Sequence, residues 1–259
     1  MADGLLLLHA FPLDHTMWSP QVEGFRRSLT VMTPDFPGFG GTPLADAPSM
    51  DTAADIAAEA LRNAGVERAV VCGLSMGGYV ALAFWRRHRA LVSGLVFANT
   101  RAGSDDEAGK ERRRALAARL RSEGQQFLAN DPPPLLSHNA PGELMTWVKN
   151  NISSQPAEAI AAASEAMANR PDSTPDLATI SVPTLIISSS DDTLIPPDAS
   201  REMANATPNA RFELIERAGH LSNMEAPDAF NELLREQLIR VGFIKEGRPK
   251  GMRTGPNIG

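Results

Sequence analysis

The sequence contains a single cysteine, Cys72, among its 259 residues. One cysteine excludes an intramolecular disulfide and any zinc site built from several thiolates. The five histidines also lack the spacing of metal ligands, so we expect no metal site. The absence of disulfides fits a reducing compartment, and a cytoplasmic location is the default expectation.

Long apolar runs and a surplus of basic residues are also missing. No stretch approaches the ~20 apolar residues that span a bilayer. The apolar run at residues 5–8 is short and has no basic leader, so we expect neither a signal peptide nor a membrane partner. With 25 Lys and Arg against 31 Asp and Glu, the net charge is -6, which argues against binding to nucleic acid.

Short apolar segments alternate with segments of helical period along most of the chain. Strands are predicted at residues 5–8, 30–33, 69–73, 94–99, 184–189 and 211–215. Helices are predicted near residues 18–28, 51–63, 76–88, 198–205 and 226–240. Because most of the strands lack polar alternation, they are expected to be buried on both faces of a mostly parallel sheet flanked by helices.

Residues 104–178 break this alternation. They contain helical patterns near 105–123, 142–151 and 156–169 but no convincing strand. We therefore predict an α/β core at 1–103 and 179–244, with a helical cap inserted at 104–178; a separate helical domain is the alternative. Residues 245–259 are rich in Gly, Pro, Lys and Arg and are predicted to form a flexible tail.

The strongest local motif is Gly73-Leu74-Ser75-Met76-Gly77. It lies between a predicted strand and a predicted helix, which is the context of a nucleophile elbow with Ser75 as the nucleophile. The turn requires small residues two positions before and after the serine. The competing interpretation is an ordinary glycine-rich turn between a strand and a helix.

A serine nucleophile needs a base and an acid from neighbouring strand ends. His220 follows the last predicted strand, so we expect it at the same sheet edge as Ser75 and assign it as general base. The acid should follow the strand at 184–189, where either Asp191 or Asp192 would serve. The chain order Ser…Asp…His is the one expected for this arrangement.

The negative charge of the transition state also needs hydrogen-bond donors, which together form an oxyanion hole. One donor is expected to be the backbone N–H of Met76, at the start of the helix after Ser75. The other is expected from the loop after the first strand. Since Pro12 has no N–H, Phe11 is the natural donor there.

With these motifs in place, the chain resembles the α/β-hydrolase superfamily, and in particular its small esterases, enol-lactonases and cofactor-free haloperoxidases. The segments that carry the resemblance are 8–14, 35–40, 73–77, 190–196 and 218–227. It implies an α/β-hydrolase fold and places the acid at Asp192. The chain departs from the family pattern at Ala10 and Ser189, where glycine is usual. The family's N-terminal strand hairpin is also missing, which leaves about six strands.

These features together predict a serine hydrolase that acts on a small carboxylic ester through an acyl-enzyme, without a cofactor. A lactonase, a perhydrolase or a carbon–carbon bond hydrolase on the same triad is the alternative, and a non-catalytic ligand receptor belongs to a different class. Trp147 and Met145 in the cap are candidate substrate contacts, although apolar residues at helical spacing usually form a helix's own core. The partner is a small-molecule ester or lactone, and a homodimer is compatible with the sequence.

Overall fold

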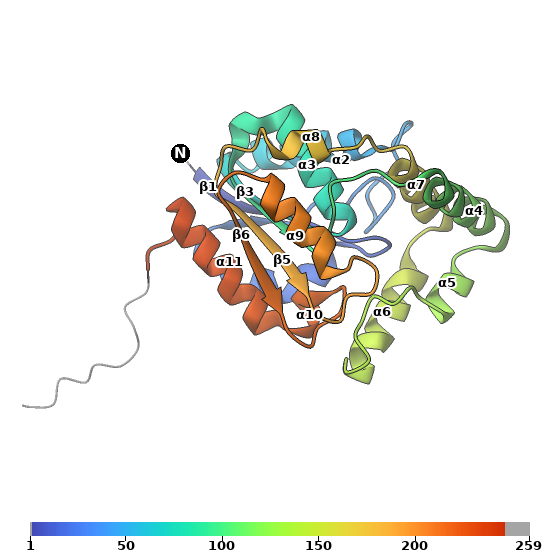
Figure 1. The fold of residues 1–259 in the computed structure, drawn as a ribbon. Helices are drawn as coiled ribbons and strands as arrows, with labels where there is room; N and C mark the ends of the chain where they lie inside the picture. Colours follow the sequence, from blue (N-terminus) through green and yellow to red (C-terminus); the bar gives the residue numbers. More distant parts are fainter. Residues whose placement is uncertain (1, 247–259) are drawn as a thin grey trace, which may run out of the picture.

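The computed structural model describes residues 2–246, which form a six-stranded parallel sheet with the strand order β2-β1-β3-β4-β5-β6 (Figure 1). The strands are β1 (Ala2–Leu8), β2 (Thr30–Met32), β3 (Val66–Leu74), β4 (Val92–Ala98), β5 (Thr184–Ser189) and β6 (Ala210–Ile215). All six predicted strands are confirmed. The α/β-hydrolase fold with a mostly parallel sheet is confirmed as well, and every pairing in the sheet is parallel.

Burial explains why the central strands read as unbroken apolar runs. Residues Leu5–Leu8 are completely buried, and β3 and β5 are buried over nearly their whole lengths. A parallel strand covered on both faces has no solvent side, so polar alternation is lost. The edge strand β6 is only half-buried over most of its length.

Helices cover both faces of the sheet. On one face lie α2 (Met50–Asn63) and α3 (Met76–His88), which pack on each other and on β1 and β3. On the other face lie α1 (Ser19–Phe25) and α11 (Pro227–Val241), which contact each other. Helix α9 (Pro197–Ala206) contacts β5, β6 and the short helix before β5. These correspond to the five core helices that the sequence predicts, with ends shifted by a few residues.

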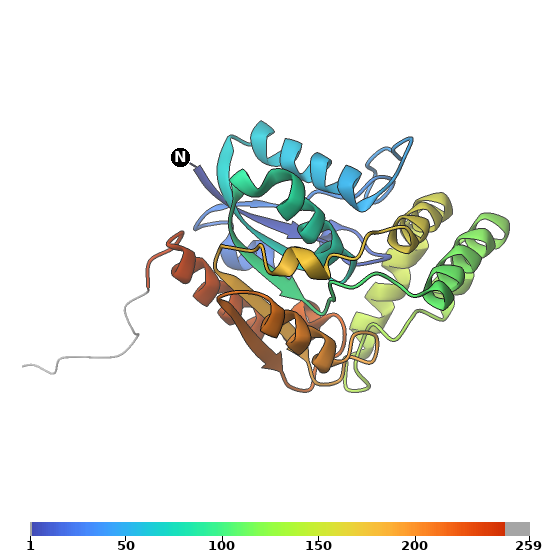
Figure 2. The same cartoon turned by 45° about the horizontal axis from the view of Figure 1, so that its top comes forward.

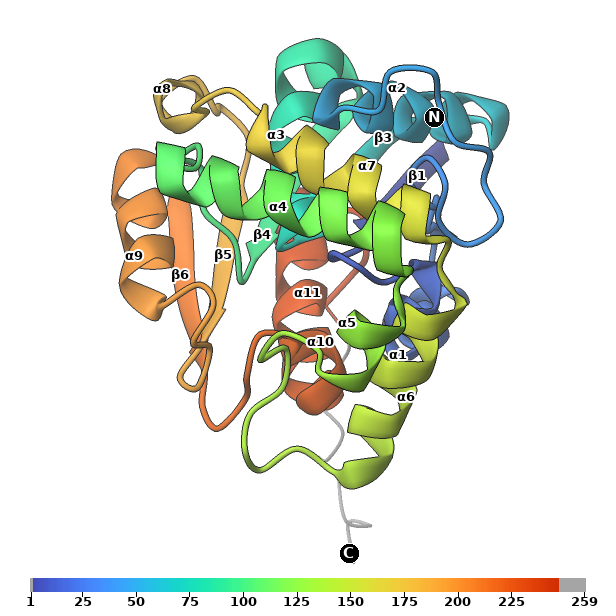
Figure 3. The same cartoon turned by 90° about the vertical axis from the view of Figure 1, so that its right-hand side faces the viewer.

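The segment between β4 and β5 contains α4 (Glu107–Glu123), α5 (Gln126–Asn130), α6 (Gly142–Ser154), α7 (Ala157–Ala168) and α8 (Thr174–Leu177). Helices α4 and α7 run side by side across the edge at which the strands end (Figures 2 and 3). Helix α4 begins two residues later than predicted because Asp106 caps it by accepting a hydrogen bond from the Gly109 amide. The sequence did not predict the one-turn helices α5 and α8.

Two predictions remain open at the ends of the chain and at the cap. The division into core and cap stays a prediction, although the helices between β4 and β5 occupy the predicted place. Residues 247–259 of the predicted flexible tail lie outside the described residues. Among residues 2–246, no helix has both the length and the apolar character needed to cross a membrane.

Candidate active site

Ser75 lies in the sharp turn between β3 and α3. Its backbone has φ 55° and ψ -115°, a conformation that few non-glycine residues adopt. Three neighbours hold it there: the Ser75 amide donates to the Ala98 carbonyl at 3.0 Å, and its carbonyl accepts from the Gly78 amide and the Thr100 hydroxyl. Such strain persists only where the surroundings fix it, and it commonly marks a functional residue.

The glycines on either side of Ser75 are required by close backbone contacts. A Cβ on Gly73 would lie 2.1 Å from the Gly77 carbonyl oxygen, and one on Gly77 would lie 2.0 Å from the Leu8 carbonyl oxygen. No real Cβ approaches backbone this closely, so the turn packs against β1 in a way that only glycine permits. The sequence requirement for small residues two positions from the serine therefore has a direct steric cause.

His220 and Asp192 form a buried pair beside this turn. The loops after β6 and β5 carry them, and His220 Nδ1 lies 2.8 Å from Asp192 Oδ2. Both side chains are almost completely shielded from solvent. Asp191, which the residues alone left as an alternative acid, is instead part-exposed, and its carboxylate accepts from the Ser190 hydroxyl. The geometry brings Asp192, and not Asp191, to the histidine.

Asp192 accepts four hydrogen bonds that fix both of its oxygens. Oδ1 accepts from the amides of Leu194 and Ile195, while Oδ2 accepts from His220 and from the Asn99 side-chain amide. Burial tends to raise the pKa of Asp192, but the hydrogen bond from His220 and the other donors outweigh burial and lower it. The carboxylate therefore stays ionised and holds the Nδ1 proton of His220 toward itself.

Asn99, at the end of β4, is a site residue that the sequence did not reveal. It is fully buried, has a positive φ of 47°, and donates to Asp192 at 2.9 Å. The side-chain oxygen of Asn99 accepts from the Ser222 hydroxyl, and its side-chain NH₂ group also donates to the Ser189 hydroxyl. Ser189, one of the two departures from the family pattern, in turn donates to the Gly219 carbonyl next to His220. These hydrogen bonds connect the loop after β5, which carries Asp192, to the loop after β6, which carries His220.

A cavity of about 390 Å³ opens beside these residues. Its lining comprises Phe11, Ser75, Tyr79, Arg101, Asp105, Gly109, Arg112, Arg113, Leu116, Pro133, Leu135, Leu194, Ile195 and His220. Ser75 and His220 therefore share one cavity wall. The Ser75 hydroxyl makes no hydrogen bond to any described residue, and such contacts are often loose in unliganded sites.

The two predicted oxyanion donors lie close to Ser75 in the fold. Phe11 lines the cavity, and Met76 begins α3 immediately after Ser75. Among the hydrogen bonds of residues 2–246, neither the Phe11 amide nor the Met76 amide donates to a protein acceptor. Neither amide is therefore committed to a protein acceptor, but only Phe11 is among the residues that line the cavity; Met76 lies at the positive end of α3.

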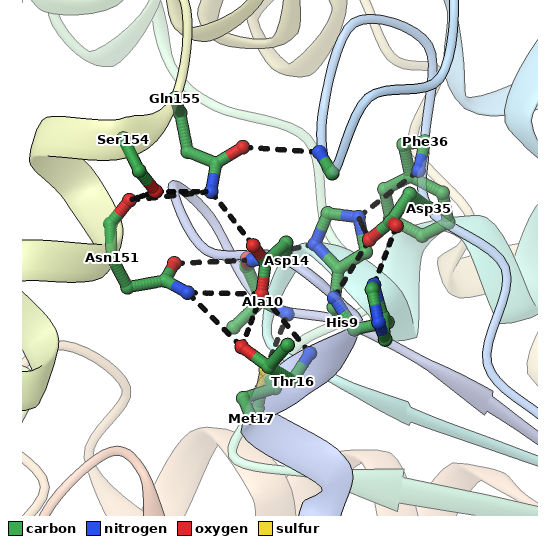
Figure 4. Close-up of polar contacts among 12 residues, drawn as sticks. His9, Ala10, Asp14, Thr16, Met17, Asp35, Phe36, Asn151, Ser154 and Gln155 are labelled. Carbon is green, nitrogen blue, oxygen red and sulfur yellow. Dashed lines mark hydrogen bonds and ion pairs between the residues drawn. The ribbon is translucent and has the colours of Figure 1, made fainter.

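A buried polar cluster joins the loop after β1 to helix α6 (Figure 4). The Asp14 carboxylate accepts from the Thr16 amide at 3.0 Å and from the side chains of Asn151 and Gln155 at 2.9 Å each. Gln155 also accepts from the Gly40 amide. Since Asn151 belongs to α6 and Gln155 caps its end, the cluster fixes α6 against the loop that carries the Phe11 amide.

The two histidines near this cluster have structural contacts. His9 accepts from the Phe36 amide at its Nε2, which leaves Nδ1 to donate to the Ala10 carbonyl, and burial lowers its pKa (Figure 4). His15 pairs with Asp35 at 2.6 Å. The carboxylate of Asp35 also accepts from the His15 amide, so it ties its own turn to the loop after β1. Neither histidine lines the cavity beside Ser75.

The structure does not bring Trp147 and Met145 to this cavity, and the lining residues named above include neither of them. Trp147 is part-buried and packs on the hydrophobic core, which is the competing interpretation of an apolar residue at helical spacing. The lining instead includes three arginines that the sequence did not mark as site residues: Arg101, Arg112 and Arg113.

Residues 2–246 contain no group of three or more His, Cys, Asp or Glu side chains placed to hold a metal ion.

Comparison with known proteins agrees with this fold. The model of the alpha/beta hydrolase family matches residues 5–233, so the chain belongs to the alpha/beta hydrolase family. Among curated relatives, the 3-oxoadipate enol-lactonase 1 of Acinetobacter baylyi is 28% identical over 94% of this chain and 89% of its own length. The pimeloyl-(acyl-carrier protein) methyl ester esterase of Aromatoleum aromaticum is 30% identical over 91% of this chain and 98% of its own.

A solved structure supports the same assignment. The thermophilic esterase from Thermogutta terrifontis, described with malate bound, superimposes with a TM-score of 0.88 and is 38% identical. The similarity covers 93% of this chain and 90% of that one. The chain is thus a member of a hydrolase family, and the proteins similar to it include esterases and an enol-lactonase.

Proposed function

We propose that the protein is a serine hydrolase that cleaves a small carboxylic ester through Ser75, His220 and Asp192. One observation carries this proposal: a strained serine shares a cavity wall with a histidine whose other ring nitrogen is held 2.8 Å from a buried carboxylate. A base in that position activates a hydroxyl that is otherwise a weak nucleophile. The esterases among the similar proteins support the same reaction class.

In this mechanism Ser75 Oγ attacks the ester carbonyl carbon while His220 Nε2 takes the hydroxyl proton. The resulting oxyanion accepts hydrogen bonds from the Phe11 and Met76 amides. The intermediate collapses, the C–O bond to the alcohol breaks, and His220 returns the proton to the departing oxygen. Water then attacks the acyl carbon and gives a proton to His220; as the bond from the acyl carbon to Ser75 Oγ breaks, His220 passes that proton to Oγ, which releases the acid and restores the serine. Asp192 stays ionised throughout and stabilises the imidazolium.

A lactonase reaction on the same residues is the second candidate. It is favoured by the enol-lactonase among the curated relatives. The chemistry differs only in that the leaving alcohol stays attached to the acyl group, so the same residues serve in both cases. Separating the two therefore depends on the substrate and not on the triad.

The experiment that tests the proposal is hydrolysis of p-nitrophenyl esters of increasing acyl length by the native protein. We expect turnover of the acetate and butyrate and a steep fall toward the laurate, because a cavity of about 390 Å³ is near the small end of ligand sites. Buffer and serum albumin measured at equal concentration give the background. A folded native protein that hydrolyses none of the esters above that background would overturn the assignment.

A further inference from the structure

The cavity beside Ser75 carries positive charge in a protein that is acidic as a whole. Its lining includes the guanidinium groups of Arg101, Arg112 and Arg113, but only one carboxylate, that of Asp105. The chain as a whole has a net charge of -6. The cavity lining beside Ser75 therefore has a net positive charge, whereas the chain as a whole has a net negative charge.

Asp105 cannot neutralise this wall. Its buried carboxylate pairs with Arg101 and Arg113 and also with Arg170, at 3.0 Å from Arg170 Nη1. Burial tends to raise the pKa of Asp105, but hydrogen bonds from Arg170 and Arg113 hold it well below the usual range. One negative charge is thus shared among three guanidinium groups. Arg170 is fixed behind the wall by the Gly103 carbonyl and by stacking on Tyr79.

Two of the lining arginines keep donors free for a ligand. The Arg101 side chain is 39% exposed, and it bonds Asp105 through Nη2 only, which leaves its Nη1 without a hydrogen-bond partner among the described residues. Arg112 is exposed, and its side chain takes part in none of the hydrogen bonds or ion pairs of residues 2–246. A guanidinium group carries five N–H donors in a planar fork that matches a carboxylate. Both side chains therefore have donors to offer to an anion in the cavity.

We propose that Arg101, Arg112 and Arg113 form an anion subsite, and that the substrate is a short aliphatic ester or lactone with a free carboxylate. This inference rests on the proposed function, since it adds the substrate class to the same site. The remaining lining, which includes Leu116, is largely apolar, as a short alkyl chain between the ester and the carboxylate requires. The arginines act in binding and in specificity, and Ser75 and His220 carry the chemistry.

A turnover experiment compares monomethyl glutarate with dimethyl glutarate, which differ in one charge. We expect the native protein to prefer the half-ester by about 10-fold or more in kcat/KM, because one hydrogen bond to a charged group is worth about a tenfold change or more. In Arg101→Gln and Arg112→Gln the preference falls by about 10-fold each, mainly through KM. Arg114→Gln is the matched control. Arg114 lies two residues after Arg112 on α4, pairs with Glu111 and does not line the cavity, so the native preference is kept.

A binding experiment separates this inference from the proposed function. Calorimetric titration of native protein and of Ser75→Ala with glutarate and with the neutral glutaramide measures the subsite without turnover. We expect glutarate to bind both proteins about 10-fold or more tightly than glutaramide, and Arg101→Gln to remove most of this difference. Equal affinity for the two ligands, or a difference that survives in Arg101→Gln and Arg112→Gln, overturns the subsite. Glutarate binding without hydrolysis of either ester supports the subsite and overturns the hydrolase.

Discussion

The Ser75→Ala variant should lose about 10⁶-fold in kcat for a short p-nitrophenyl ester, down to the background rate. The expected loss is this large because the acyl-enzyme forms on Ser75 Oγ in this mechanism, and without it the base has no hydroxyl to activate. Donors to the oxyanion would still bind the substrate, so KM should change little. The measurement is steady-state release of p-nitrophenol at enzyme concentrations high enough to detect the residual rate.

The control for this variant must show that the fold is intact. The Ser75 hydroxyl has no hydrogen bond to lose, so urea unfolding of Ser75→Ala should give the native free energy of unfolding within about 1 kcal/mol. Ser122→Ala on the exposed surface of α4 serves as the matched serine variant and should keep native activity. If folded Ser75→Ala retained more than about a tenth of the activity, Ser75 would not be the nucleophile.

The Asp192→Asn variant should lose about 10⁴-fold in kcat. In the native protein the Asp192 carboxylate accepts a hydrogen bond from the N–H at His220 Nδ1. The asparagine amide of the variant can instead donate its N–H to Nδ1, which stabilises the tautomer that carries its proton at Nε2 and cannot accept another there. Asp191→Asn is the matched control, because Asp191 lies next in sequence but does not contact His220, and its activity should stay within about 3-fold of native. Loss of activity in Asp191→Asn instead would show that the acid is misassigned.

The Asp192→Asn variant is also expected to change the acid stability of the protein. The pKa of Asp192 is lower in the folded protein than its ordinary value, so its ionisation contributes stability above that ordinary value, which is near ~3.9. This contribution is lost as the pH falls below ~3.9 and through the lower folded-state pKa. The free energy of unfolding of Asp192→Asn should therefore fall less steeply with acid than that of the native protein.

Much of the fold could be predicted because its signals are local. Apolar runs without polar alternation, such as residues 5–8, mark strands that are buried on both faces, and the turn at Gly73–Gly77 marks the change from strand to helix. The helices of the cap could be recognised by their period. The one-turn helices α5 and α8 could not, because a single turn is too short to show one.

The rest of the site depends on contacts between distant segments. Asn99 reaches Asp192 only because β4 and β5 are neighbours in the sheet, and nothing near Asn99 in sequence indicates that contact. The run Arg112-Arg113-Arg114 suggests a solvated helix face, yet the packing of α4 turns two of these three side chains toward the cavity. Trp147 illustrates the opposite case, since its apolar character serves the packing of the core.

Covalent labelling with a fluorophosphonate, which reacts with an activated serine, tests most directly whether Ser75 is the nucleophile. The labelled protein is digested with trypsin, and the adduct is located by fragmentation of the peptide that spans residues 69–86 and contains Ser75. The proposed mechanism predicts one phosphonyl group per chain, on Ser75, with labelling abolished in Ser75→Ala and strongly slowed in His220→Ala. Stoichiometric labelling of a different residue, or no labelling of folded protein that hydrolyses esters, would contradict it.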